Sequence, residues 1–96
     1  MKAVKFHPDA ESEMLAAAAY YEEQQPDLGR RFLASVQDAV NRIILNPNLY
    51  PTVDLDVRRC LTKTFPFGVL FRDQPRHIVI MAVMHQHRDP QYWKTR

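Results

Sequence analysis

The sequence predicts a two-layer α+β domain, in which a helical hairpin packs on a largely antiparallel sheet. Three observations lead to this fold class: two amphipathic helical stretches in the first half, alternating apolar residues in the second, and the unbroken apolar run Ile78 to Met84. An apolar run this short is typical of a strand covered on both faces. The expected order is strand, helix, helix and three strands, and short links between the last strands favour antiparallel pairing.

A short strand, Ala3 to Phe6, comes first, and a helix follows it. Pro8 suits the first helical position, where a backbone N–H would be unpaired anyway. Gln24-Gln25-Pro26 ends this helix. Its apolar stripe consists of Ala10, Met14, Ala17, Ala18 and Tyr21.

The second helix is expected from Leu28 to about Leu45, with Asp27 as its N-cap. Asn46-Pro47 ends it, and the short link between the helices predicts a helical hairpin. The buried stripe of this helix consists of Phe32, Val36, Ala39, Val40 and Ile43.

The second half is expected to hold three strands after a proline-rich connector, residues 46–56. The turn at Asp73 to Arg76 separates the last two strands, and Asp89-Pro90 favours one final helical turn, Pro90 to Lys94. Buried-strand composition requires cover on the second face of the sheet, so the tail or a partner chain is expected to lie there. The expected strands are Val57 to Thr62, Phe65 to Arg72 and His77 to Met84.

Composition describes an ordinary globular chain of 96 residues, one domain over residues 1–96, with 46% hydrophobic and 25% charged residues. No apolar run approaches the roughly 20 residues that span a bilayer, so no membrane partner is expected. The N-terminus lacks the apolar core of a signal peptide, and the single Cys60 excludes an internal disulfide, which fits a reducing compartment.

The charge is unevenly distributed. Residues 1–48 carry five basic and seven acidic side chains, a balance of −2, whereas residues 49–96 carry eight basic and four acidic ones, a balance of +4. This asymmetry either marks a face for nucleic acid or an acidic partner, or places acids at helix starts and bases on exposed strand positions.

One set of side chains has the chemistry of metal-free RNA cleavage. Arginines can stabilise the charge that develops on a phosphate while histidine or tyrosine moves protons. The alternative is that the arginines are solvated strand positions and the histidines cap the strand. The candidate catalytic residues under the nuclease interpretation are Arg58, Arg72, His85, Arg88 and Tyr92.

Other catalytic chemistries find less support. His85 and His87 could bind a metal with Cys60 or His77, but two ligands without a Cys-x-x-Cys motif are a weak signal, and no metal site is predicted. Cys60 is expected to be buried and inert. The chain has only two glycines, so no glycine-rich phosphate loop exists and no cofactor is predicted.

A protein partner is the second functional hypothesis. Tyr92 and Trp93 either lock the tail onto the sheet or present an anchor to a partner, and the apolar helix stripes suggest a groove that a partner helix or strand could fill. The candidate partner-binding residues are Met14, Tyr21, Phe32, Val36, Arg59, Tyr92 and Trp93.

Short motifs over almost the whole chain carry a family resemblance. Together, in this order and at these spacings, they resemble the ParE branch of the RelE/ParE superfamily of bacterial type II toxin–antitoxin modules. The motifs are Phe6-x-Pro8-x-Ala10, Tyr20-Tyr21-Glu22, Leu28-Gly29-x-x-Phe32, Asn46-Pro47, Tyr50-Pro51, Arg58-Arg59, Phe65-Pro66-Phe67 and Ala82-Val83-x-His85-x-x-Arg88-Asp89-Pro90-x-Tyr92-Trp93.

The resemblance implies the strand-helix-helix-three-strand fold, a cytoplasmic toxin, and a cognate antitoxin that neutralises it in a hetero-oligomer. RelE-like members cleave mRNA on the ribosome, whereas ParE-like members inhibit DNA gyrase without being nucleases. The acidic connector, the low net charge and the absence of a histidine-tyrosine pair depart from the nuclease pattern. The resemblance therefore favours gyrase as the target; a ribosome-dependent mRNA endonuclease and a non-toxic binding module of the same fold remain the alternatives.

Overall fold

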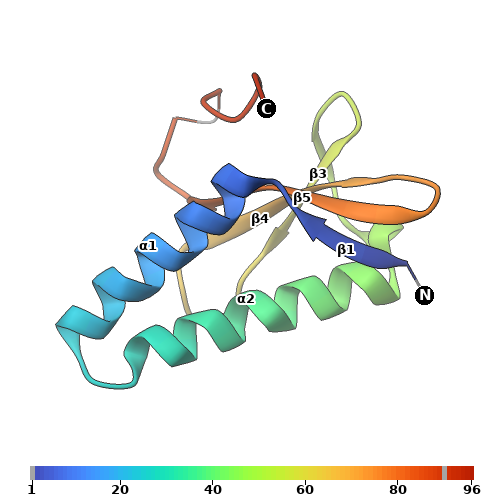
Figure 1. Ribbon diagram of the computed structural model, residues 1–96. Helices are drawn as coiled ribbons and strands as arrows, with labels where there is room; N and C mark the ends of the chain where they lie inside the picture. The colour runs from blue at the N-terminus through green and yellow to red at the C-terminus, as the bar shows by residue number, and fades with distance from the viewer. Residues whose placement is uncertain (1, 90) are drawn as a thin grey trace.

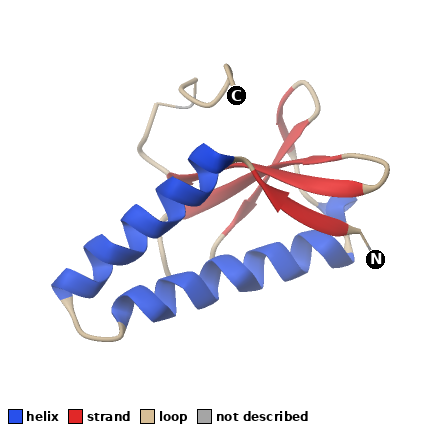
Figure 2. Ribbon diagram, in the orientation of Figure 1, coloured by secondary structure: helices blue, strands red, loops and turns tan. Residues whose placement is uncertain are grey.

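The computed structural model of the protein describes residues 2–89 and 91–96. The described residues form two long helices, a short 3₁₀ turn and five strands. Figure 1 shows their arrangement along the chain, and Figure 2 shows the helices grouped beside the sheet. The elements are β1 Ala3–Phe6, α1 Pro8–Gln24, α2 Leu28–Leu45, a 3₁₀ turn Pro47–Leu49, β2 Thr52–Asp54, β3 Val57–Leu61, β4 Phe67–Asp73 and β5 His77–His85.

The five strands form one sheet in the order β1-β5-β4-β3-β2. β2, β3, β4 and β5 pair antiparallel, whereas β1 pairs parallel with β5. The predicted α+β class and the helical hairpin are confirmed. The expected order omitted β2, which lies in the proline-rich connector; three residues without clear alternation are too short for a periodic signal.

The helices cover one face of the sheet. Both predicted helix stripes lie in a single apolar core with the inward residues of β4, and Tyr21, Phe32, Phe65 and Phe67 form a group of edge-to-face and tilted rings within it. Neither helix is long and apolar enough to cross a membrane, within the part of the chain that the structure describes.

A β-bulge in β5 changes which of its side chains face the helices. Leu70 pairs with Ala82 and Phe71 pairs with Ile80, so Met81 has no partner residue on β4. Ile80 and Val83 therefore both pack in the helix-side core, while Ala82 packs on the opposite face. The bulge explains why the run from Ile78 to Met84 serves both faces without regular alternation.

The junction of the helices differs from the prediction in one detail. Asp27 has a left-handed backbone (φ 75°) and its side chain makes no capping hydrogen bond; it binds Arg30 instead. The Glu22 carboxylate accepts from the N–H groups of Asp27 and Gly29 at 2.9 and 3.0 Å and so takes over the cap. A Cβ at Gly29 would lie 2.5 Å from the Ala18 carbonyl oxygen, so the close approach of the helices requires glycine there.

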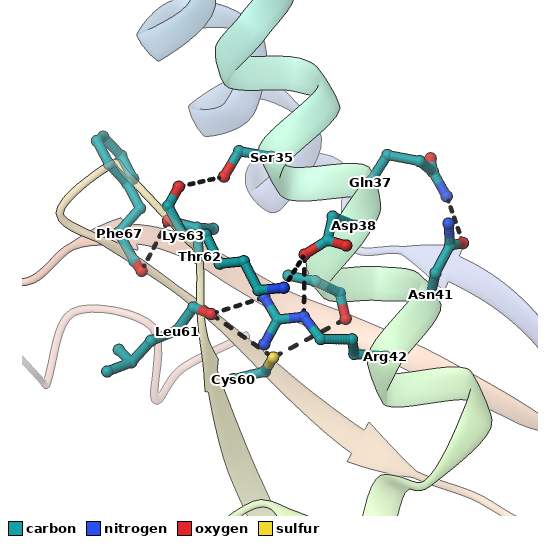
Figure 3. Close-up of polar contacts among 11 residues, drawn as sticks. Ser35, Gln37, Asp38, Asn41, Arg42, Cys60, Leu61, Thr62, Lys63 and Phe67 are labelled. Carbon is teal, nitrogen blue, oxygen red and sulfur yellow. Dashed lines mark hydrogen bonds and ion pairs between the residues drawn. The ribbon is translucent and has the colours of Figure 1, made fainter.

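Polar contacts fasten α2 to the link between β3 and β4 (Figure 3). Ser35 donates to the Lys63 carbonyl at 2.7 Å, and Arg42 donates to the Leu61 carbonyl at 3.0 Å while also pairing with Asp38. Cys60 lies beneath this link and its thiol faces the Ala39 carbonyl. These contacts fix the position of β3 relative to α2. They thereby also fix the position of Arg59, which projects from β3 on the face of the sheet away from the helices.

Candidate functional site

The C-terminal tail covers the second face of the sheet. The sequence predicted that either this tail or a partner chain would lie there. Trp93 is 3% exposed and packs with Val57, Leu70, Ala82 and Met84. The tail forms successive turns from residue 91 to 95 rather than a regular helix, and Pro90, the predicted first helical residue, lies outside the described residues. Asp89 accepts from the Gln91 N–H at 2.9 Å, which stabilises the start of these turns.

A groove of about 320 Å³ runs between the tail and the strands β2, β3 and β4. Its floor is apolar and its rim is charged: Arg59 and Arg88 are exposed, and neither has a carboxylate within ion-pair distance among the described residues. Lys94 on the same rim pairs with Asp54 at 3.4 Å. The groove therefore combines an apolar surface with excess positive charge. The residues that matter for its shape and charge are Arg59, Gly68, Leu70, Met84, Arg88 and Trp93.

Gly68 gives this groove its depth. A Cβ at Gly68 would lie 3.3 Å from the Cγ and Cδ atoms of Arg59 and 3.6 Å from a Leu61 methyl group. Because Gly68 has no side chain, the aliphatic stem of Arg59 lies across β4 and its guanidinium stays at the rim. Gly68 is thus a residue of the site that the sequence did not reveal, since an isolated glycine in a strand has many possible causes.

A buried ion pair holds the end of the tail against α1. Arg96 donates to both Glu13 oxygens at 2.8 and 3.0 Å, although the residues are 83 positions apart, and the side chains are only 10% and 14% exposed. Burial acts to raise the pKa of Glu13, but the hydrogen bonds and charge of Arg96 outweigh it and hold that pKa below its usual 4.5. The guanidinium groups of Arg88 and Arg96 both lie over the Tyr92 ring, 3.9 and 4.9 Å from its centroid.

Tyr92 is poorly suited to proton transfer. Its hydroxyl is buried and makes no hydrogen bond to a described residue, although the Glu13 carboxylate lies beside it. Burial and this carboxylate raise the pKa of Tyr92 far above its usual value of 10. A phenol that ionises so reluctantly is a weak general base at neutral pH, and its buried oxygen cannot reach an RNA strand.

The structure brings together only part of the predicted nuclease set. His85, Arg88 and Tyr92 lie at the end of β5, where the Arg88 N–H donates to the His85 carbonyl. Arg58 and Arg72 lie near the opposite end of the sheet, since His85 pairs with Phe67, five residues before Arg72 on β4, or roughly 17 Å. Arg58 donates to the Tyr50 carbonyl at 2.7 Å, and Arg72 donates to Asp56 at 3.2 Å.

The predicted partner-binding residues also divide. Phe32 and Val36 are 0% and 1% exposed inside the core, so their assignment to a partner surface is corrected: their stripe packs on the chain's own sheet. Met14 and Tyr21 are half-buried at the edge of the same core. Arg59 is exposed in the groove, and Trp93 forms its floor.

His85 ends β5 and His87 follows it, whereas Cys60 lies in β3. The His85 and His87 rings are 5.3 Å apart, and the His85 Nδ1 atom accepts from the His87 N–H. Cys60 is buried beneath α2, which raises the pKa of its thiol. Among the residues that the structure describes, no three metal-ligating side chains gather.

Comparison with known proteins defines the family. The family described as "ParE toxin of type II toxin-antitoxin system, parDE" matches residues 4–90. The chain belongs to the ParE toxin family. A solved structure titled "Chromosomal ParDE TA system from P. aeruginosa" shares the fold of this ParE toxin, with a TM-score of 0.64 and 21% identity over 88% of this chain and 96% of that chain. A search of curated protein sequences found no match to this chain.

The sequence missed the residues that fix the tail of this ParE toxin. No contact between Glu13 and Arg96 was predicted. Their pairing depends on a contact across 83 residues, and no periodic signal connects the two positions. Only the uneven charge distribution could have indicated this contact, because an acidic first half and a basic second half are expected to attract each other.

Proposed function

We propose that this ParE toxin is neutralised by a protein antitoxin and acts by inhibiting DNA gyrase. Membership of the ParE family supports the toxin role, and the family resemblance implies the target. The observation that carries the choice against mRNA cleavage is the state of the tail: the Tyr92 hydroxyl is buried, while Arg58 and Arg72 are bound elsewhere on the sheet.

A gyrase assay tests the target. Purified, refolded toxin is mixed with gyrase, ATP and supercoiled plasmid, and linear DNA is scored after denaturation and protease treatment. Linear product that increases with toxin concentration is the expected result, because it records a trapped cleavage complex. Unimpaired supercoiling without linear product would contradict the proposal and would direct attention to ribosomes programmed with mRNA.

A set of variants separates the two toxin mechanisms in cells. Arg72→Ala and His85→Ala remove predicted nuclease groups, and Tyr92→Phe removes only the hydroxyl while the ring keeps its contacts with Arg88 and Arg96. Growth inhibition by the folded triple variant should match that of the unsubstituted toxin. Loss of toxicity with retained folding would support nuclease chemistry, and an unsubstituted chain that never slows growth would support the non-toxic module.

The groove beside the tail supports the antitoxin as a partner. Its apolar floor and the free charges of Arg59 and Arg88 match a segment that carries acidic and apolar side chains. Arg59→Ala should weaken antitoxin binding about tenfold, as loss of one charged contact does. Arg30→Ala, which breaks an exposed ion pair with Asp27 on the helix side, is the matched control and should bind normally.

A further inference from the structure

β5 extends beyond the strand that pairs with its outer edge. The last pair between β1 and β5 is Phe6 with Ile80, after which the chain turns into α1, while β5 continues to His85. From Met81 onward no described strand pairs with this edge. An open edge in the middle of a sheet is a place where another extended chain can bind, unless other groups occupy its backbone donors and acceptors.

In this structure, the side chains of Arg96 and Glu13 bind the backbone groups of the open edge of β5. Arg96 Nη1 donates to the Met81 carbonyl at 3.0 Å and to Glu13 Oε1 at 2.8 Å. The same Glu13 oxygen accepts from the Val83 N–H at 3.3 Å. One donor and one acceptor, joined to each other as an ion pair, thus satisfy the carbonyl of one residue and the N–H of the residue two positions later.

This is the pattern of a parallel β-ladder. In such a ladder, a single residue of the neighbouring strand donates its N–H to one carbonyl and accepts from the N–H two residues further along. The Glu13–Arg96 pair reproduces these contacts opposite Ala82, on the side where β1 runs parallel to β5. The bulge at Met81 directs these two backbone groups to the open edge.

A cleft of about 460 Å³ lies between this edge and α1. Ala16 and Ala17 line it from α1, Val83 and His85 line it from β5, and Arg88 lines it from the segment after β5. The small side chains on α1 leave space for an extended backbone beside β5. Glu13 lies in the same cleft, so removal of Arg96 would leave a poorly solvated carboxylate there, which is costly without a new cation.

We propose that the edge of β5 from Met81 to His85 is a strand-addition site for an extended segment of the antitoxin, and that Arg96 occupies this site in the free toxin. The segment runs parallel to β5, replaces Arg96 at the Met81 carbonyl and Glu13 at the Val83 N–H, and carries a lysine or arginine that pairs with Glu13. This assignment rests on the proposed neutralisation by an antitoxin. Antitoxin binding and docking of the tail end therefore exclude each other at this edge.

The test compares two variants of the Glu13–Arg96 ion pair with a control variant. Arg96→Ala should bind the co-purified, separately refolded antitoxin about tenfold more tightly than the unsubstituted toxin, because the competitor for the edge is gone. Glu13→Gln should gain less, because it removes the competitor and also the carboxylate that the segment needs. Arg30→Ala should bind like the unsubstituted toxin. Calorimetry gives the affinities, and thermal unfolding confirms that each variant is folded.

Hydrogen exchange of single amides gives a second readout. The Val83 amide should exchange faster in free Arg96→Ala than in the free unsubstituted toxin, and should become strongly protected in both antitoxin complexes. Equal affinities of all variants with unchanged Val83 exchange on binding would overturn the strand-addition site but leave neutralisation intact. Absence of any antitoxin binding, by the unsubstituted toxin and all variants, would overturn the proposed neutralisation and this site together.

Discussion

The two faces of the sheet are covered in different ways. On one face, two helices bury a continuous apolar core that includes Phe32, Phe71 and Ile78, all without exposed surface. On the other, a short tail buries one large residue, Trp93, over a small apolar patch and is held by an ion pair and two cation–π contacts. The helix side provides most of the buried apolar surface, whereas the tail side depends on a few contacts that can open locally.

The largest expected difference is between the central aromatic residues of the two faces. Phe32→Ala should lower the free energy of unfolding by about 3–5 kcal/mol, because it leaves a cavity in the closed helix-side core. Trp93→Ala should cost only about 1.5–3 kcal/mol, because the tail can detach while the core persists. Urea unfolding measures both; equal losses would show that the tail is part of the same cooperative core.

The two glycines sharpen the comparison. Gly29→Ala should destabilise the fold by about 1–3 kcal/mol, since the new Cβ would meet backbone at 2.5 Å and force the helices apart. Gly68→Ala should cost less than about 1 kcal/mol, because the flexible stem of Arg59 can move, but it should weaken antitoxin binding by narrowing the groove. Unfolding curves and binding titrations distinguish the outcomes, and a reversed order of stabilities would contradict the contrast.

The smallest expected effect is a change in the free energy of unfolding at low pH. The pKa of Glu13 is lower in the folded chain than its usual 4.5, so its ion pair contributes fully above that pH and is lost as the pH falls through the folded-state value. Because the cost of desolvating this buried pair offsets much of its attraction, the expected contribution is about 1 kcal/mol. Unfolding of the Glu13→Gln variant should therefore vary less between pH 6 and pH 3 than unfolding of the unsubstituted toxin; parallel curves would show that Glu13 contributes nothing.

Sequence patterns predicted the helix side well because its signals are local and periodic. The stripes from Ala10 to Tyr21 and from Phe32 to Ile43 lie in the core as expected, and the run after His77 is the buried strand. For the tail side, the sequence predicted only that the second face of the sheet would be covered. How the tail covers it depends on long-range contacts. The bulge at Met81, the pairing of Glu13 with Arg96 and the separation of Arg72 from His85 all follow from strand register, which single residues do not encode.

The position of β5 in the sheet also sets the order of events during synthesis. β1 is made first but pairs with β5, and β5 is the last strand to be made although it lies between β1 and β4. β1 therefore cannot join the sheet until residues 77–85 have been made, and completion of the sheet depends on contacts between segments far apart in the sequence. The groove between the tail and the sheet is likewise lined by residues from β2 to Lys94, so it forms only after these last residues have been made.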